Sequence, residues 1–365
     1  MTRARPNPRP ISHQERELRA RLLAWYRANR RDLPWRRTRD PYAIWLSEAM
    51  LQQTRVETVL AYYARFLERF PTLGELARAS EDEVLALWSG LGYYRRARAL
   101  HAAARRVVER HAGRFPSARA EALALPGVGR YTAGAVLSIA FDAPEPLVDG
   151  NVERVFSRLF GLDAPAGSPA LVRACWELAA RLVPARGAGE WNQALMELGA
   201  TVCTARAPRC AACPLEDACR AALEGRATEL PRKKAGRAAL PVELEILVVE
   251  RGGDRLLELG RGRRMQGLWR FPTRELARAD EPPRLFPASW GAALAALDEL
   301  GALRHTITHH RIRARIRRGS ASGDPPDPPF RWFPPARIPG LPLSGMTRKA
   351  LARLDRSSPA APRAE

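Results

Sequence analysis

The stretch Leu125-Pro-Gly-Val-Gly-Arg-Tyr-Thr-Ala-Gly-Ala-Val136 constrains the fold of this chain more than any other segment. Pro126, Gly127 and Gly129 are costly inside a helix, whereas the small residues from 131 to 139 have helical spacing. We therefore predict a tight turn that leads into a helix N-terminus. Glycines there let backbone N–H groups approach an anion, which the helix dipole also favours. A phosphate is the expected anion, and a plain corner between two helices is the alternative.

The net charge indicates the kind of partner. The 365 residues carry a formal charge of +21, and lysine occurs only as Lys233, Lys234 and Lys349, so arginine supplies nearly all the positive charge. Such an excess favours a polyanionic partner, most often nucleic acid. An arginine-rich codon bias would raise the ratio of arginine to lysine but would not create the excess. The length suits two domains.

Nothing in the sequence indicates a membrane or secreted protein. Residues 1–13 are rich in Pro and Arg without an apolar core, so we expect a disordered arm rather than a signal peptide. No stretch approaches the roughly 20 apolar residues of a membrane-spanning helix. We expect a soluble intracellular protein.

Residues 14–222 contain only helix and turn signals, which predicts an all-α domain. Before the glycine-rich turn, six helical segments are expected, at Gln14–Asn29, Tyr42–Phe70, Thr72–Ala79, Ser80–Ser89, Tyr94–His111 and Ala118–Leu123.

The pattern changes after residue 222. Residues 223–240 are basic and flanked by proline, as linkers often are, and residues 241–353 form the expected second, smaller domain. Val242–Val249 is β-branched and partly alternating, Arg251–Asp254 is a turn, and Arg255–Leu259 is the expected partner strand. A loop is expected at Gly319–Pro329 and a disordered tail at 354–365.

The segment Arg311–Arg317 alternates strictly between arginine and apolar residues. As a strand it places Ile312, Ala314 and Ile316 on a buried face and four arginines on the other face. We interpret the arginine side as facing a phosphate backbone, with a solvated face as the alternative.

Four cysteines lie close together and predict a metal site. Six, two and five residues separate Cys203, Cys210, Cys213 and Cys219, and four thiolates can hold a tetrahedral zinc ion or an iron–sulfur cluster. Structural zinc more often uses two Cys-x2-Cys pairs, and only one is present. The spacing therefore favours a [4Fe-4S] cluster, with zinc as the alternative. Cys175, on an apolar helix, is the expected buried thiol.

Two acidic residues have apolar neighbours. Glu48 lies in an apolar helix, where desolvation would raise its pKa toward that of a general acid. Asp149 follows Pro-Leu-Val and precedes Gly-Asn. One protonated and one ionised carboxyl group suit the cleavage of a glycosidic bond. The alternatives are a salt bridge for Glu48 and a helix N-cap for Asp149.

The turn and helix at Leu125–Val136, Asp149 and the cysteine loop at 203–219 together resemble the helix-hairpin-helix DNA glycosylase superfamily that includes endonuclease III, in which the turn at Leu125–Val136 is the hairpin. Within it, five motifs resemble the adenine DNA glycosylase (MutY) family, and the match runs from about residue 14 into the C-terminal domain. These motifs are Leu33–Arg37, Ser47–Val56, Gly90–Tyr94, Val148–Val152 and Trp191–Gly199.

The resemblance implies removal of adenine mispaired with 8-oxoguanine or guanine in double-stranded DNA, as in base excision repair. Bifunctional relatives carry at the position of Tyr131 a lysine that forms a Schiff base and cleaves the strand. The tyrosine therefore predicts a monofunctional glycosylase. A non-catalytic lesion-binding protein and a bifunctional pyrimidine glycosylase are the alternatives.

The resemblance also assigns roles to residues. Glu48, Asp149, Tyr131 and Asn151 are the implied catalytic group, with Glu48 protonating the adenine and Asp149 stabilising the sugar cation. The implied substrate and DNA contacts are Arg36, Leu51 and Gln193 in the adenine pocket, Gln53 and Tyr93 as wedges in the base stack, and Gly127 and Gly129 in the hairpin.

The C-terminal domain resembles the family's α+β Nudix-like domain, which reads 8-oxoguanine. Ile307, Thr308 and His309 match its Phe-Ser-His reading loop, and the lost aromatic side chain predicts weaker stacking. The glutamate-rich metal motif of Nudix hydrolases is missing, so no pyrophosphatase activity is expected. The resemblance further implies a monomer in the cytoplasm, associated with the nucleoid.

Overall fold

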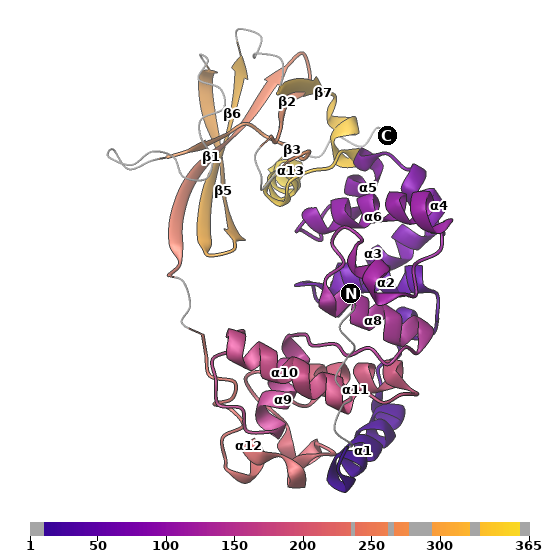
Figure 1. Cartoon of the computed structure of the whole chain (residues 1–365). Coiled ribbons are helices and arrows are strands. Elements are labelled where there is room, and N and C mark those ends of the chain that lie inside the picture. The colour runs from indigo at the N-terminus through magenta and orange to yellow at the C-terminus, as the bar shows by residue number, and fades with distance from the viewer. Residues whose placement is uncertain (1–10, 235–237, 262–265, 277–293, 322–328, 358–365) are drawn as a thin grey trace, which may run out of the picture. The chain divides into compact units, whose positions relative to one another are not determined.

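The computed structural model describes residues 11–234, 238–261, 266–276, 294–321 and 329–357. Most of the predicted arm and tail lies outside these ranges. By its contacts the chain divides into two units, one of Met1–Arg78 with Ala99–Ala235 and one of Ala79–Arg98 with Gly236–Glu365. Figure 1 shows helices in the first unit and a sheet in the second. Across the described ranges no helix has both the length and the apolar character that crossing a membrane requires.

The first unit is helical, as predicted. Ser12, inside the expected arm, caps its first helix by accepting a hydrogen bond from the backbone of Glu15. The helices are α1 (His13–Asn29), α2 (Pro41–Leu51), α3 (Val56–Arg69), α4 (Leu73–Arg78), α7 (Arg119–Leu123), α8 (Arg130–Phe141), α9 (Gly150–Leu159), α10 (Pro169–Leu182), α11 (Ala188–Thr201) and α12 (Arg220–Leu223), while α6 (Arg95–His111) begins in the second unit.

The prediction of one helix over Tyr42–Phe70 is wrong, because α2 and α3 are separate helices. Gln53, between them, has a φ of 58° in the left-handed region, which a right-handed helix cannot contain. The segment holds no proline or glycine that would have indicated the break. The break places Gln53 on an exposed turn beside the end of α2.

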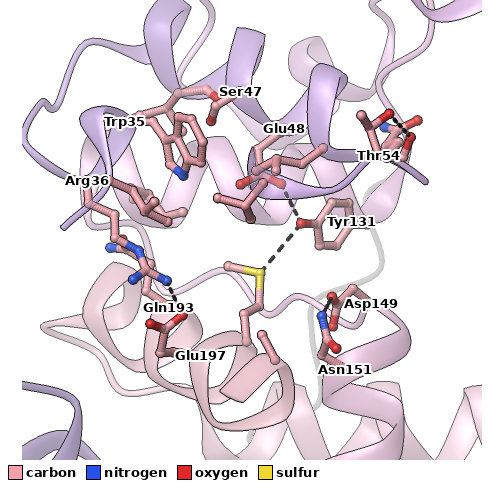
Figure 2. A pocket seen from close by; sticks show the side chains of 18 of the residues that line it. Trp35, Arg36, Ser47, Glu48, Thr54, Tyr131, Asp149, Asn151, Gln193 and Glu197 are labelled. Atoms are coloured by element: carbon pink, nitrogen blue, oxygen red, sulfur yellow. Dashed lines mark hydrogen bonds and ion pairs between the residues drawn. The ribbon is translucent and has the colours of Figure 1, made fainter. Parts of the chain in front are cut away.

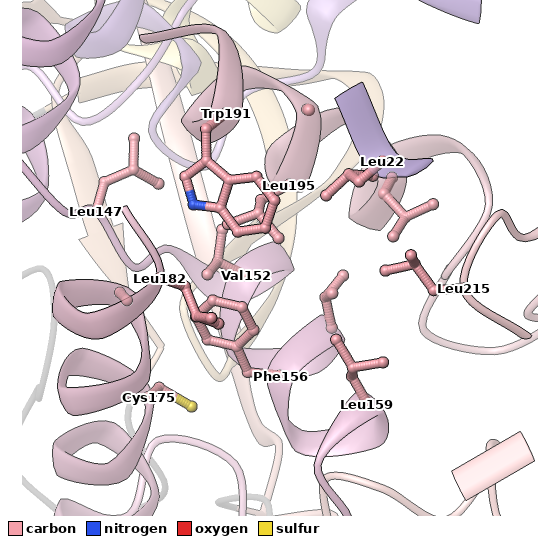
Figure 3. Packing of buried hydrophobic residues seen from close by; sticks show 14 of the residues in the cluster. Leu22, Leu147, Val152, Phe156, Leu159, Cys175, Leu182, Trp191, Leu195 and Leu215 are labelled. Atoms are coloured by element: carbon pink, nitrogen blue, oxygen red, sulfur yellow. The ribbon is translucent and has the colours of Figure 1, made fainter. Parts of the chain in front are cut away.

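A hydrophobic core formed by α1 and α8–α11 fixes the helices that carry the candidate site (Figure 3). Phe156 and Val152 of α9 pack in the same cluster as Trp191 of α11 and Leu22 of α1. Cys175 is fully buried there, so its prediction as a core thiol is confirmed. On α11, a Cβ at Gly199 would lie 2.6 Å from the Cβ of Asn151, so only glycine lets α9 come this close.

The second unit contains one mixed sheet with strand order β3-β2-β1-β6-β5, while β4 pairs with β1 and β7 with β2. The predicted hairpin across Arg251–Asp254 is confirmed by antiparallel pairing of β1 and β2. The strands are β1 (Leu240–Arg251), β2 (Asp254–Leu259), β3 (Trp269–Arg270), β4 (Thr273–Glu275), β5 (Leu294–Ile307), β6 (His310–Ala321) and β7 (Phe330–Phe333).

The predicted alternation of β6 is confirmed, since Ile312, Ala314 and Ile316 are at most 2% exposed. They share a hydrophobic cluster with Met346 and Ala350 of α13 (Gly345–Ser357). The loop predicted from residue 319 is wrong for its first three residues. Pairing with β1 and β5 extends β6 to residue 321.

One segment belongs to the second unit although, in the sequence, it lies between two segments of the first unit. Residues Ala79–Arg98 include α5 (Glu81–Trp88) and the Gly-Leu-Gly-Tyr-Tyr loop. The hydroxyls of Ser89 and Tyr94 donate to the carbonyl of Leu343 at 3.1 and 2.8 Å, and Arg348 Nε donates to Ser89 at 2.7 Å. No sequence feature indicated this grouping.

Candidate active site

A cavity of about 570 Å³ opens in the first unit between α2, α8, the start of α9 and α11 (Figure 2). Its volume lies in the usual range for small-molecule sites. Eight of the predicted site residues line it together, namely Arg36, Glu48, Leu51, Gln53, Tyr131, Asp149, Asn151 and Gln193.

Glu48 lies on α2, a helix capped by Asp40 and buried along nearly its whole length. Its side chain accepts a hydrogen bond from the hydroxyl of Tyr131, so its partner is a neutral donor rather than the salt bridge considered above. Burial raises the pKa of Glu48 to about 7, and the negative charge of Asp149 adds to this, against the hydrogen bond from Tyr131. Glu48 can therefore hold a proton near neutral pH.

Tyr131 is in the first turn of α8, directly after the hairpin. Burial, and then the nearby carboxylates, raise the pKa of Tyr131 well above its ordinary value, so it stays a neutral hydroxyl. The same oxygen lies 3.5 Å from the sulfur of Met196 on α11. Tyr131 thus links the hairpin helix to the acid on α2, as the dashed lines of Figure 2 show.

Asp149 is the N-cap of α9, so the capping alternative is correct for this residue. One carboxylate oxygen accepts from the backbone of Val152 at 2.7 Å and the other from Asn151 Nδ2 at 2.8 Å. Burial raises the pKa of Asp149, while these two hydrogen bonds oppose the shift. Capping does not exclude a catalytic role, because the same bonds fix the carboxylate at the wall of the cavity.

Sequence reasoning missed an ion cluster at the other end of the cavity. Glu197 on α11 is fully buried and accepts hydrogen bonds from Arg31 and Arg36, at 2.7 and 2.8 Å from their terminal nitrogens. Burial alone would raise the pKa of Glu197, but the bonds from the two arginines outweigh it and lower the pKa to about 2. The sequence did contain a signal for Glu197, because a glutamate within an apolar helix is the same feature that indicated Glu48.

Arg154 on α9 connects Asn151 with the cysteine loop. Its Nη2 donates to Asn151 Oδ1 at 2.7 Å and to the carbonyl of Gly199 at 2.8 Å. Its Nε donates to the carbonyl of Cys203 at 2.7 Å. The position of Asn151, which holds Asp149, therefore depends on the cysteine loop.

The two glycines of the hairpin, at positions 127 and 129, differ in what the structure requires of them. Gly127 has a φ of 73°, and a Cβ there would lie 2.5 Å from the Cβ of Ala99, so packing and backbone both require glycine. Gly129 is the N-cap of α8, and a Cβ there would meet nothing within 4 Å. Only Gly129 leaves open space at the helix N-terminus for a ligand.

Three predicted DNA-contact residues have strained backbones. Gln53, Tyr93 and Thr308 are among the five non-glycine residues with positive φ in the described ranges, at 58°, 49° and 53°. Tyr93, in the second unit, is 52% exposed. Thr308 and His309 form the turn between β5 and β6. Such strain often marks binding sites, because surrounding structure must maintain it.

The four cysteines of the loop line one mainly apolar cavity with Arg158, although no three His, Cys, Asp or Glu side chains among the residues described here are grouped so as to hold a metal ion. Arg158 is 2% exposed and donates to the sulfur of Cys203 at 3.2 Å. A buried cation beside four thiols fits the negative charge of a thiolate-bound iron–sulfur cluster. The donor set therefore fits the predicted cofactor.

Comparison with known proteins relates this chain to DNA repair. Residues 46–181 match the family model of the HhH-GPD superfamily base excision DNA repair proteins. An adenine DNA glycosylase of Rattus norvegicus is 50% identical along an alignment of 226 residues, and the match covers 58% of this chain and 44% of the relative. For an adenine DNA glycosylase of Arabidopsis thaliana the identity is 36% along an alignment of 360 residues, and the match covers 83% of this chain and 57% of the relative. The chain thus spans about half the length of these relatives.

Solved structures agree on the helical unit. A thermostable thymine-DNA glycosylase is 32% identical, with a TM-score of 0.53, over 58% of this chain and 97% of that structure. A trapped endonuclease III–DNA intermediate is 24% identical with a TM-score of 0.51 over 59% of this chain, which supports the fold alone. The family model and the near-complete match to the first structure show that this chain belongs to the HhH-GPD superfamily of base excision DNA repair proteins.

Proposed function

We propose that this chain is a monofunctional adenine DNA glycosylase that removes adenine mispaired with 8-oxoguanine or guanine. The observation that carries the proposal is a cavity lined both by the buried Glu48, which is hydrogen-bonded to Tyr131, and by the fixed carboxylate of Asp149. The adenine glycosylases among the relatives support adenine as the base.

In the proposed mechanism, an adenine flipped out of the duplex enters the cavity, at a cost of a few kcal/mol. Arg36, Leu51 and Gln193 line its wall and would position the base. Protonated Glu48 would donate to N7 of adenine, so that the base leaves as a neutral molecule when the glycosidic bond breaks.

The sugar then carries the positive charge of an oxocarbenium ion, which the carboxylate of Asp149 would stabilise. Asn151 and the backbone of Val152 hold this carboxylate in position. Glu48, now ionised, would take a proton from the attacking water. Tyr131 offers no amine for a Schiff base, so the strand would stay uncut.

DNA binding would use the Gly129 turn for a phosphate and the strained residues Gln53 and Tyr93 as wedges. In the second unit, the turn at Thr308 and His309 would read the base opposite adenine, and we keep the Nudix-like assignment of this unit as part of the proposal. An Ile307→Phe variant should then bind 8-oxoguanine duplex more tightly. Unchanged affinity would assign the reading to another segment.

Cys203, Cys210, Cys213 and Cys219 would hold a [4Fe-4S] cluster that supports DNA binding and the fold of its loop. The expected composition is four iron and four acid-labile sulfide per chain, and stoichiometric zinc instead would contradict it. As part of the same proposal, the protein would act as a monomer on chromosomal DNA in the cytoplasm.

The test is a single-turnover assay on duplexes with adenine opposite 8-oxoguanine, guanine or thymine, each sample split between alkali and no alkali. Cleavage only after alkali, and only for the first two duplexes, is expected. Cleavage without alkali would indicate a bifunctional enzyme. No product from any duplex would contradict adenine excision.

A further inference from the structure

Four arginines lie on one exposed face of the sheet in the second unit. Their strands, β5 and β6, are neighbours in the sheet (Figure 1). Arg304, Arg311, Arg313 and Arg315 are all exposed, and we name this set the arginine face. The register places Arg304 directly opposite Arg313, so two like charges share one cross-strand position. The opposite face of β6 is buried, as described above.

This arrangement costs stability in the free protein, because like charges directly opposite each other in a sheet repel. In the described ranges the structure shows no ion pair for any of the four arginines. Glu243 of β1 stands in register with Arg313 and is exposed, but Glu245, in register with Arg315, already pairs with Arg274 and Arg317. The face therefore keeps an excess of positive charge that an external anion would balance.

We infer that the arginine face docks the sugar-phosphate backbone of DNA beside the turn at Thr308. Alternate residues of a strand are about 6.6 Å apart. The phosphates of one DNA strand rise by about 3.4 Å each along the helix axis, and because the backbone winds around that axis, neighbouring phosphates lie farther apart in space than this rise. Arg311, Arg313 and Arg315 can therefore meet neighbouring phosphates of one strand. The choice of DNA as the partner rests on the proposed function, whereas the arginine face itself is identified from charge and strand register.

The test replaces the facing pair, with Arg304→Gln/Arg313→Gln compared with the control Arg331→Gln/Arg337→Gln. The control removes the same charge from exposed arginines of the same unit. Affinity for an undamaged duplex is measured against salt concentration in the full chain. The slope of log K against log salt should become shallower by about 0.9 to 1.8 for the pair, because each lost phosphate contact contributes about 0.9 and the two arginines share one cross-strand position, and it should stay unchanged for the control.

A second readout separates docking from misfolding. Without DNA, the Arg304→Gln/Arg313→Gln variant should have a Tm higher by about 1–3 °C, because the repulsion is removed. A variant with both positions changed to lysine keeps the charge and should keep the salt slope. An unchanged slope in the glutamine pair, or an equal loss in the lysine pair, would overturn the inference and leave a solvated face or a site for an acidic protein.

Undamaged duplex offers no mispair, so this result does not depend on catalysis. A shallower slope in a chain that releases no adenine would refute the proposed function and keep the docking surface. Adenine release with an unchanged slope would support the proposed function and refute the docking surface.

Discussion

The two ends of the cavity each hold a buried glutamate, and their pKa values move in opposite directions (Figure 2). Glu48 meets a tyrosine hydroxyl, and burial raises its pKa to about 7. At Glu197 burial acts in the same direction, but two arginines outweigh it and bring the pKa to about 2. The partner, rather than burial alone, decides which carboxyl group can carry a proton.

The difference assigns a separate task to each end. Glu48 has the pKa of a proton donor near neutral pH, whereas Glu197 is a permanent anion that holds Arg36 against the cavity wall. The proposed mechanism needs both, because the base must be positioned at one end while it is protonated at the other.

The largest expected effect comes from removing the proton donor, Glu48. Glu48→Gln keeps the shape of the side chain but has no acidic proton, so single-turnover adenine release should fall by about 10³-fold. Binding to mispaired duplex should persist. Glu68→Gln, on the exposed side of α3, is the matched control and should keep the wild-type rate. Undiminished release by Glu48→Gln would end the acid role.

Breaking the other end should affect folding more than chemistry. Glu197→Gln removes a buried charge and leaves Arg31 and Arg36 without their partner, so the free energy of unfolding should fall by about 3–5 kcal/mol. Denaturant unfolding at pH 7.5 measures this. A loss below about 1 kcal/mol would mean that the three charges are not coupled as the structure shows.

Asp149→Asn sharpens the distinction between capping and catalysis. Asparagine is as good an N-cap as aspartate, so the hydrogen bond from Val152 should persist. Its Nδ2 replaces the oxygen that accepts from Asn151, so the free energy of unfolding should fall by about 1–3 kcal/mol while the chain still folds. The lost negative charge should lower the excision rate by about 10²-fold. A stable variant with the wild-type rate would leave Asp149 with only its capping role.

The smallest effect concerns Tyr131, whose hydrogen bond lowers the pKa of Glu48 against the effect of burial. Tyr131→Phe removes that donor, so the pKa of Glu48 should rise and the alkaline limb of the pH–rate profile should move up by about 0.5–1 unit. Tyr62→Phe on α3 is the control. A shift toward lower pH would contradict the assigned direction of the hydrogen bond.

Part of this site could be predicted from local signals in the sequence, and the other residues were predicted from the family resemblance. Glu48 and Asp149 are acids in apolar surroundings, and the glycines of the hairpin mark a turn. Eight predicted residues line one cavity, although their roles stay predictions. The same local signal existed at Glu197, but its arginine partners lie about 160 residues away in the chain. Only the fold reveals such a pairing.

The fold was less predictable where long-range pairing decides the structure. The break between α2 and α3 lacks proline and glycine, so no local signal preceded Gln53. The extension of β6 beyond Gly319 comes from its neighbours β1 and β5. The placement of Ala79–Arg98 with the C-terminal unit depends on hydrogen bonds to Leu343 and Arg348, which are remote in sequence.

The pH dependence of single-turnover adenine excision, measured from pH 5 to 9 on duplex with adenine opposite 8-oxoguanine, tests the central claim most directly. Because the pKa of Glu48 is raised to about 7, Glu48 is protonated below that pH and ionised above it. The rate should therefore be level at low pH and fall about tenfold per unit well above pH 7. A rate that stays level to pH 9 would contradict a proton donated by Glu48.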